Sequence, residues 1–250
     1  MDKKNKIVIV GATSAIAMHC ARLWVQGKPV ELVLVGRDRG RLERVAADLR
    51  VRSPLSGVQS VEAEFLDPAG IQAAVDAIVA AGRPDVVLIA HGFLPDQHAC
   101  EDDLKACRDA LEFNGISPVL YAEAFARQMA LAGQGTLALI GSVAGDRGRR
   151  SNYVYGSAKG LLTRYTQGLQ HRFAGTAVRV VLIKPGPTDT PMTAHLKDSG
   201  AKLAPVEEVA RMIVAAVERG SAVAYVPARW QLIMMVIRHL PRFVFARLDI

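Results

Sequence analysis

Short apolar runs alternate with helix-length segments along the whole chain. Each run has four to eight residues and is apolar almost throughout, as a strand buried on both faces should be. Alternating strands and helices predict right-handed crossovers and an α/β fold, a doubly wound parallel sheet of about seven strands with helices on both faces. The predicted strands are Lys6–Val10, Val30–Val35, Val58–Phe65, Asp85–Ala90, Thr136–Gly141, Ala177–Ile183 and Ala222–Val226. The predicted helices include Ser14–Gln26, Arg39–Arg50, Pro68–Ala80, Ser117–Ala132, Asn152–Phe173 and Pro205–Glu218.

The chain has the size and composition of one globular domain. With 250 residues, 50% of them hydrophobic and 22% charged, it can bury a large core without disulfides or metals, which excludes a disordered or fibrous protein. No linker or repeat interrupts it, so we expect residues 1–227 to form the sheet domain and residues 228–250 to form an apolar, basic helical tail of the same domain. Three cysteines indicate reduced thiols; Cys100 and Cys107 are expected to pack on one face of a single helix.

The net charge of +7 and an isoelectric point near 9.5 favour anionic partners. A phosphate-containing cofactor, a membrane surface or a nucleic acid would each fit, but no nucleic-acid recognition motif is present, so we expect no nucleic acid. The N-terminal sequence MDKKNKIVIVGA lacks the apolar stretch of a signal peptide, and we expect a cytoplasmic protein. The six histidines have no ligand spacing, and we expect no metal.

Two loops at strand ends have the residues of a nucleotide site. The segment Gly11–Ala17 follows the first strand and opens a helix, whose free amides and dipole attract phosphate; a plain strand–helix turn would look similar. After the second strand, Gly36 and Arg37 stand where an NAD-selective site would carry a carboxylate. Arginine there favours the 2′-phosphate of NADP, whereas Arg39 fits equally well as part of a solvated charge run.

A candidate catalytic pair lies at the start of the long helix predicted after the fifth strand. Tyr155 and Lys159 are four residues apart and therefore share a helix face. An ammonium group beside a phenol favours the phenolate, so we expect Lys159 to lower the pKa of Tyr155 toward the working range of an acid catalyst. The Tyr-x-x-x-Lys spacing alone is common in proteins, so the surrounding motifs must show whether this pair is catalytic.

With these motifs in place, the sequence resembles the short-chain dehydrogenase/reductase family over about residues 5 to 227. Six features match in the family's order. They are Gly11-x-x-x-Ala15-x-Ala17, Asp67 in Phe65-Leu66-Asp67, Ile89-Ala90-His91-Gly92, Asn114 in Phe113-Asn114-Gly115, Ser142 thirteen residues before Tyr155-x-x-x-Lys159, and Pro185-Gly186-Pro187-Thr188-Asp189-Thr190. The departures are Ala15 and Ala17 in place of two motif glycines, and Ile-Ala-His-Gly in place of the usual Asn-Asn-Ala-Gly.

The resemblance implies a Rossmann-type domain that transfers hydride between NADP(H) and a carbonyl or secondary alcohol. In that scheme Tyr155 donates the proton, Ser142 holds the carbonyl oxygen, Lys159 binds the nicotinamide ribose, and Asn114 holds a water of the proton relay. Thr190 and the Thr188 main chain fix the carboxamide. The full set of cofactor-binding positions implied is Gly11, Thr13, Ser14, Ala15, Ile16, Arg37, Leu66, Asp67, His91, Gly92, Tyr155, Lys159, Pro185, Thr188 and Thr190. The family also implies a homodimer or homotetramer.

Two further segments each allow two interpretations. The basic run Arg147–Arg150, between Ser142 and Tyr155, fits a solvated loop or a site that binds an anion of the substrate. The stretch Arg229–Ile250 has an apolar run, four arginines and one aspartate. It is too short and too charged to span a bilayer, and it fits a membrane interface or lipid-binding mouth as well as an oligomer or core contact.

The tail and the loops near His91 and Ser142 are similar to those of the subgroup that includes decaprenylphosphoryl-2-keto-pentofuranose reductases. That resemblance implies a lipid-linked keto-sugar as substrate and a peripheral location on the inner face of the membrane. The main hypothesis is thus an NADP(H)-dependent ketoreductase. A soluble reductase of small carbonyl compounds is the nearest alternative, and a non-catalytic NADP-binding sensor is the next.

Overall fold

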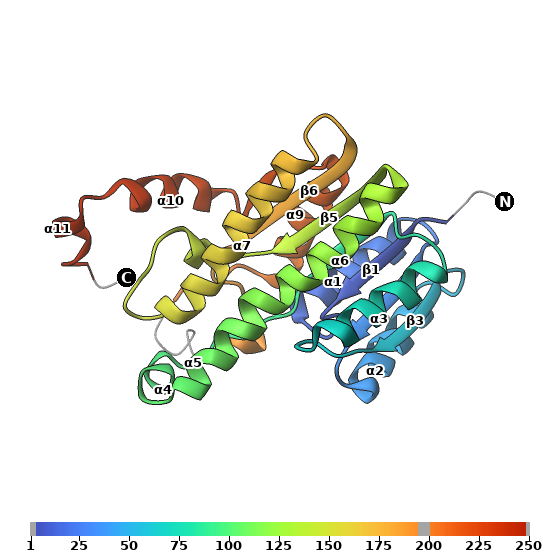
Figure 1. Cartoon of the computed structure of the whole chain (residues 1–250), viewed down its shortest axis with the longest axis horizontal. Coiled ribbons are helices and arrows are strands. Elements are labelled where there is room, and N and C mark those ends of the chain that lie inside the picture. The colour runs from blue at the N-terminus through green and yellow to red at the C-terminus, as the bar shows by residue number, and fades with distance from the viewer. Residues whose placement is uncertain (1–3, 195–200, 249–250) are drawn as a thin grey trace.

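A computed structural model describes residues 4–194 and 201–248. In this part of the chain, seven parallel strands form one sheet in the order β3-β2-β1-β4-β5-β6-β7, with helices on both faces (Figure 1). The strands are β1 (Lys6–Val10), β2 (Glu31–Gly36), β3 (Gly57–Glu62), β4 (Val86–Ile89), β5 (Gln134–Ile140), β6 (Ala177–Pro185) and β7 (Val223–Val226). The predicted fold class is confirmed, and the predicted strand ends differ from these by no more than three residues.

Helices connect successive strands up to β7, and the last two helices follow β7. They are α1 (Ala15–Gly27), α2 (Arg39–Arg52), α3 (Pro68–Ala80), α4 (Gln97–Asp102), α5 (Leu104–Leu111), the π-helical turn η1 (Glu112–Ile116), α6 (Ser117–Ala132), α7 (Tyr153–Arg172), α9 (Val206–Arg219), α10 (Arg229–His239) and α11 (Arg242–Phe245). Two 3₁₀ turns, η2 (Val143–Asp146) and η3 (Pro191–Thr193), follow β5 and β6. The six predicted helices are present with ends shifted by no more than two residues.

The sheet divides the core into two layers because neighbouring side chains of a strand point to opposite faces. In β1, Ile7 and Ile9 pack with residues of α1, α2 and α9, whereas Val8 and Val10 pack with residues of α3, α6 and α7. Both layers are mainly apolar where they meet the sheet, which explains why the strands are apolar at consecutive positions.

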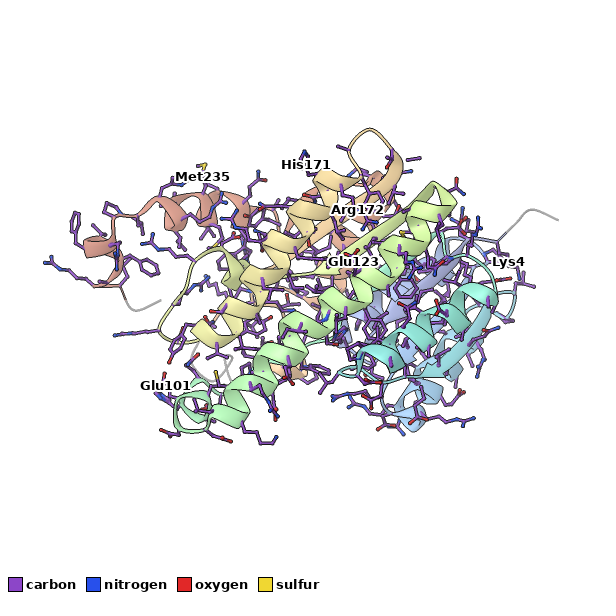
Figure 2. The ribbon with its side chains drawn as sticks, viewed as in Figure 1. Lys4, Glu101, Glu123, His171, Arg172 and Met235 are labelled. Carbon is purple, nitrogen blue, oxygen red and sulfur yellow. The ribbon has the colours of Figure 1, made fainter. Side chains whose placement is uncertain are left out.

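On the face that carries α6 and α7, the two helices lie side by side (Figure 1). Glu123 of α6 bonds to Arg172 and Tyr165 of α7, at 2.9 Å and 2.6 Å (Figure 2). These contacts join the long helix that carries Tyr155 to its neighbour.

Strand order reverses between β1 and β4. The chain adds β2 and β3 on one side of β1, and then continues on the other side with β4 to β7. The loops after β1 and β4 therefore diverge at the carboxyl edge of the sheet, where open parallel sheets bind ligands. The predicted site residues are on the loops at this edge or on the helices that begin there.

The cysteine prediction is wrong in one respect. Cys100 lies in α4 and Cys107 in α5, so the two do not share one helix. The carboxylate of Asp103 accepts a hydrogen bond from the Lys105 amide and caps α5, which ends α4 at the preceding residue. Both thiols still pack together beside Val154, and Cys20, Cys100 and Cys107 are free.

The C-terminal segment forms an arm of two helices that extends from the body beside α7 (Figure 1). Pro241 separates α10 from α11. Met234 is fully buried, whereas Leu232, Val236 and Phe243 are 63%, 53% and 70% exposed. Within the described residues, none of the helices has the length and apolar character needed to cross a bilayer. Asp249 and Ile250, at the end of the predicted tail, lie outside the described residues, and the division at residue 227 remains a prediction.

Candidate active site

One cleft lies at the carboxyl edge of the sheet, beyond β4, β5 and β6. It encloses about 860 Å³, including its open mouth. Ten of the predicted site residues line it: Ser14, Ile16, His91, Gly92, Ser142, Tyr155, Lys159, Pro185, Thr188 and Thr190. The structure thus brings together residues from four separate loops and from α7. Gly11, Thr13, Ala15, Arg37, Leu66, Asp67 and Asn114 lie outside the lining of this cleft.

Three of the predicted catalytic side chains meet on one wall of the cleft. Ser142 follows β5, and Tyr155 and Lys159 lie one turn apart in α7. The Tyr155 hydroxyl lies near that of Ser142. The buried ammonium of Lys159 donates to the carbonyl of Ile140 at 3.1 Å and lies 5.7 Å from the ring centre of Tyr155. A carbonyl oxygen placed beside Ser142 would reach both hydroxyls.

Burial governs the protonation of this pair. Loss of solvent raises the pKa of Tyr155 to about 12, although the nearby Ser142 hydroxyl favours the phenolate. Burial also lowers the pKa of Lys159 to about 8. The expectation that Lys159 lowers the pKa of Tyr155 is therefore wrong for this structure, because desolvation of the phenolate outweighs an ammonium placed beside the ring. At neutral pH the tyrosine is a proton donor and the lysine is cationic.

Asn114 holds the loop beneath these residues. It lies in the π-helical turn η1 and is fully buried. Its Oδ1 accepts a hydrogen bond from the Phe93 amide at 2.8 Å, and its Nδ2 donates to the Ala110 carbonyl at 2.9 Å. Both ends of the side chain thus bind main chain and fix the loop after β4. The water that Asn114 was expected to hold remains a prediction.

The turn after β1 has the geometry of a phosphate cradle. Gly11 has φ +82°, and a Cβ there would lie 2.5 Å from the main-chain nitrogen of His91, so only glycine fits. Ser14 is the N-cap of α1, but its side chain makes no capping hydrogen bond. The Ser14 side chain therefore does not occupy the first N–H groups of α1. Ala17 is buried in the core, where its methyl group fills space that a glycine would leave.

Arg37 is exposed at the end of β2, with its guanidinium carbon 4.3 Å from the ring centre of Phe113. The neighbouring carboxylate of Asp38 accepts a hydrogen bond from the Arg41 amide at 2.8 Å and caps α2. The carboxylate of Asp67 caps α3 through the Gly70 amide at 2.7 Å, and Leu66 is half-exposed beside it. Arg37 is thus the charged side chain here that can bind an anion, since both neighbouring carboxylates cap helices.

His91, which replaces the usual small residue of its loop, is buried among aromatic rings. Phe65, Phe113 and Tyr121 surround it, and its Nε2 lies 2.9 Å from the Ser117 hydroxyl. Burial, with the charges of Lys159 and Arg37, lowers the pKa of His91 well below its ordinary value. The imidazole is therefore neutral, and it shapes the floor of the cleft rather than carrying charge.

The loop after β6 closes the other side of the cleft. The Thr188 hydroxyl donates to the Gly186 carbonyl at 2.9 Å, and Thr188 pairs with Ala204 in an isolated bridge. Thr190 caps η3 and exchanges hydrogen bonds with Thr193. The loop is therefore held by its own hydrogen bonds, with Thr188 and Thr190 at the cleft surface.

Sequence reasoning missed several residues of the site. Asn152, Leu94 and Met192 line the cleft, and so does Arg149, for which the sequence allowed either a solvated loop or an anion site. A buried network holds the η2 turn: the Asp146 carboxylate pairs with the Lys184 ammonium and accepts a hydrogen bond from the Tyr225 hydroxyl at 2.7 Å. The sequence signal for this network was a lysine directly after the apolar run Val180–Ile183 of strand β6.

The arginines of the basic run Arg147–Arg150 have different roles. Arg147 donates to the carbonyls of Ile237 and Leu240, the latter at 2.8 Å, and its guanidinium lies 3.7 Å from the ring centre of Phe245. It thus fastens both helices of the C-terminal arm to the catalytic loop. In the part of the chain that the structure describes, histidine, cysteine and acidic side chains form no group of three that could hold a metal.

Comparisons with known proteins agree with this geometry. Residues 5–200 match the family described as short chain dehydrogenase. An uncharacterized oxidoreductase of Streptomyces coelicolor is 34% identical, covering 98% of this chain and 96% of its own, and one of Mycobacterium tuberculosis is 32% identical, covering 97% and 96%. The fold is similar to that of a short-chain dehydrogenase from Sphingobium yanoikuyae in complex with NADPH, with a TM-score of 0.82, 22% identity and coverage of 98% and 96%.

Proposed function

The chain belongs to the short-chain dehydrogenase family, and we propose that it reduces a ketone to a secondary alcohol with NADPH as reductant. The observation that carries the proposal is the meeting of Ser142, Tyr155 and Lys159 on one wall of a cleft, with the tyrosine protonated and the lysine cationic at neutral pH. These are the groups that an alkoxide needs as it forms.

The residues present fit an NADP cofactor. The N-terminus of α1 offers main-chain donors to a pyrophosphate, Gly11 provides the tight turn that leads to it, and Arg37 offers a guanidinium to a 2′-phosphate. The carboxylate of Asp38, which would otherwise select NAD, is engaged by the Arg41 amide. A structural neighbour of the same fold is described in complex with NADPH. We therefore infer a preference for NADP(H) over NAD(H).

Each catalytic side chain has a distinct task in the reduction. The cofactor, when bound, supplies hydride to the carbonyl carbon. The Tyr155 hydroxyl donates a proton to the carbonyl oxygen as negative charge develops on it, and the Ser142 hydroxyl donates a hydrogen bond to the same oxygen. The Lys159 ammonium lies close enough to stabilise the phenolate that remains. Asn114 positions the Phe93 loop that borders the site.

A finer proposal concerns the size of the substrate. We propose that it is lipid-linked, as for the keto-sugar reductases that the sequence resembles, and that the enzyme acts at the inner surface of a membrane. The support is the C-terminal arm, which carries exposed apolar side chains together with Arg229, Arg238, Arg242 and Arg247. Arg147 joins this arm to the catalytic loop, so a lipid bound there would lie next to the cleft.

The test is a substrate panel. The purified protein is assayed for oxidation of NADPH, and in parallel NADH, with polyprenyl-linked keto-sugars, free keto-sugars and simple ketones. The proposal predicts turnover with NADPH and higher kcat/KM for the lipid-linked member. Turnover of simple ketones alone would favour a soluble reductase, and the absence of turnover in both directions with every class would contradict the proposed activity.

A further inference from the structure

Arg149 is a charged wall residue of the cleft that neither catalysis nor the fold uses. It lies on the loop between η2 and α7, partly buried, and lines the same cleft as Ser142 and Tyr155. A guanidinium carries five N–H donors. An arginine on this wall of the cleft can contact the part of a substrate that lies next to the carbonyl being reduced.

The donors of Arg149 lack acceptors in the described part of the protein. Its Nε is fully buried without a hydrogen-bond partner there. Its Nη2 lies 3.9 Å from the sulfur of Met234, which is a weak acceptor. A buried cation without acceptors is costly to a fold, and such a group is typically retained where a ligand completes it. Burial accordingly lowers the pKa of Arg149.

The charge of Asp146 acts on Arg149 and opposes the lowering of its pKa, but the Asp146 oxygens bond to other residues. One oxygen of Asp146 pairs with Lys184, and the other accepts from Tyr225. Arg147, two residues earlier, has carbonyl partners and an aromatic ring instead. The two arginines thus differ: Arg147 is structural, whereas Arg149 lines the cleft without a strong acceptor among the described residues.

A second polar group of the same wall is also unpaired. The Oδ1 of Asn152 is buried without a hydrogen-bond partner among the described residues, and Asn152 lines the cleft. Two unpaired polar groups, on the side of the cleft that carries Tyr155, indicate a polar ligand rather than a plain hydrocarbon ketone.

We propose that the ketone substrate carries an oxyanionic group, a phosphate ester or a carboxylate, and that Arg149 binds it. This rests on the proposed function, because the anion belongs to the molecule whose carbonyl Tyr155 protonates. The charge-assisted bonds of the guanidinium fix the distance between the anion and the carbonyl, so Arg149 determines specificity. A phosphodiester of a lipid-linked sugar and a free phosphate or carboxylate share this chemistry.

The first experiment compares matched ketones. Reduction by NADPH is measured with acetoacetate and methyl acetoacetate, and with dihydroxyacetone phosphate and dihydroxyacetone. The ratio of kcat/KM for the anionic member to that for the neutral member should fall at least about tenfold in Arg149→Met, and Arg149→Lys should restore part of it. Arg150→Met removes an exposed charge from the same loop and should keep the wild-type ratio.

The second experiment does not depend on turnover. Binding of phenyl phosphate is measured by calorimetry on protein saturated with NADP⁺, which fills the cofactor's own phosphate sites, with benzyl alcohol as the neutral control. Wild type and Arg150→Met should bind phenyl phosphate at least about tenfold more tightly than Arg149→Met. Circular dichroism and thermal unfolding establish that each variant folds.

The outcomes separate this proposal from the proposed function. Ketone reduction with an unchanged anionic-to-neutral ratio in Arg149→Met would overturn the anion site and leave the reductase intact. Binding of phenyl phosphate that depends on Arg149, without reduction of any ketone, would support the anion site and contradict the reductase. Equal binding by wild type and Arg149→Met would overturn the anion site in either case.

Discussion

The ammonium of Lys159 lies 5.7 Å from the ring centre of Tyr155, one helical turn away on α7. Burial favours the neutral form of both groups. It raises the pKa of Tyr155 to about 12 and lowers that of Lys159 to about 8. Near neutral pH the pair is thus a protonated phenol beside a cation, which suits proton donation to a developing alkoxide. Above pH 8 the cation is lost while the phenol stays protonated.

The low pKa of Lys159 has a consequence for stability. Its pKa is about 8 in the folded protein and 10.5 unfolded, so between these values the unfolded state binds more protons and the free energy of unfolding rises with pH. Below pH 8 the cost of the buried charge is fully present. The free energy of unfolding of Lys159→Met should therefore be about 2–3 kcal/mol higher than that of wild type near pH 7. This difference between the variant and wild type should become smaller by about pH 10.

Urea unfolding of the cofactor-free protein at both pH values measures this difference. Lys105→Met is the matched control, because Lys105 is exposed on α5 and pairs with Asp109 at the surface. A difference between Lys159→Met and wild type that did not vary with pH would show that Lys159 keeps an ordinary pKa.

The choice of cofactor should depend on Arg37. In Arg37→Ala the 2′-phosphate loses a charge-assisted bond of roughly 1.5–3 kcal/mol, so KM for NADPH should rise about ten- to a hundredfold while KM for NADH changes much less. Arg127→Ala, which removes an exposed charge from α6, serves as the control. Equal changes in the two Michaelis constants would assign Arg37 to the solvated charge run.

The buried pair of Lys184 and Asp146 should be essential to stability. Both side chains are almost fully buried, at 4% and 2% exposure, and removing one partner leaves the other as an uncompensated charge. Lys184→Met should lower the free energy of unfolding by about 3–5 kcal/mol in urea titration. A loss under about 1 kcal/mol, as expected for an exposed pair such as Lys105 and Asp109, would contradict this role.

The C-terminal arm should bind anionic vesicles. Its exposed apolar side chains gain from burial, and each arginine near such a surface adds about 1 kcal/mol. Met235 projects outward from α10 (Figure 2), and Leu232 and Val236 are exposed on the same helix. Co-sedimentation should be strong at low salt and weaker at high salt, and Leu232→Glu with Val236→Glu should abolish it.

This double substitution leaves Met234 and the Arg147 contacts in place, so reduction of small soluble ketones serves as its internal control. Co-sedimentation that is absent at low salt, or unchanged by the two glutamates, would assign the arm to contact with a second subunit and favour the soluble reductase.

Much of this architecture was predictable because it depends on local pattern. Consecutive apolar positions indicated doubly buried strands, and the four-residue spacing placed Tyr155 and Lys159 on one helix face. The π-helical turn around Asn114 was not predictable, because its hydrogen bonds to Phe93 and Ala110 join it to another loop. The pKa of Tyr155 was mispredicted, since the tyrosine–lysine spacing gives proximity but not burial.

The division of labour between Arg147 and Arg149 was equally hidden. Both belong to one basic run, but the C-terminal arm gives carbonyl acceptors to Arg147 and only the weak acceptor Met234 to Arg149. Contacts between segments some 90 residues apart have no local signal in a single sequence.

The central claim is that the Tyr155 hydroxyl is the proton donor of a reductase, and Tyr155→Phe tests it most directly. The measurement is single-turnover oxidation of bound NADPH by the best ketone of the panel, with binding of NADPH titrated separately. We predict that the reduction rate falls about 10²–10⁴-fold while the dissociation constant for NADPH stays within about twofold. A variant that kept more than about a tenth of the wild-type rate would contradict the assignment of Tyr155 as the acid.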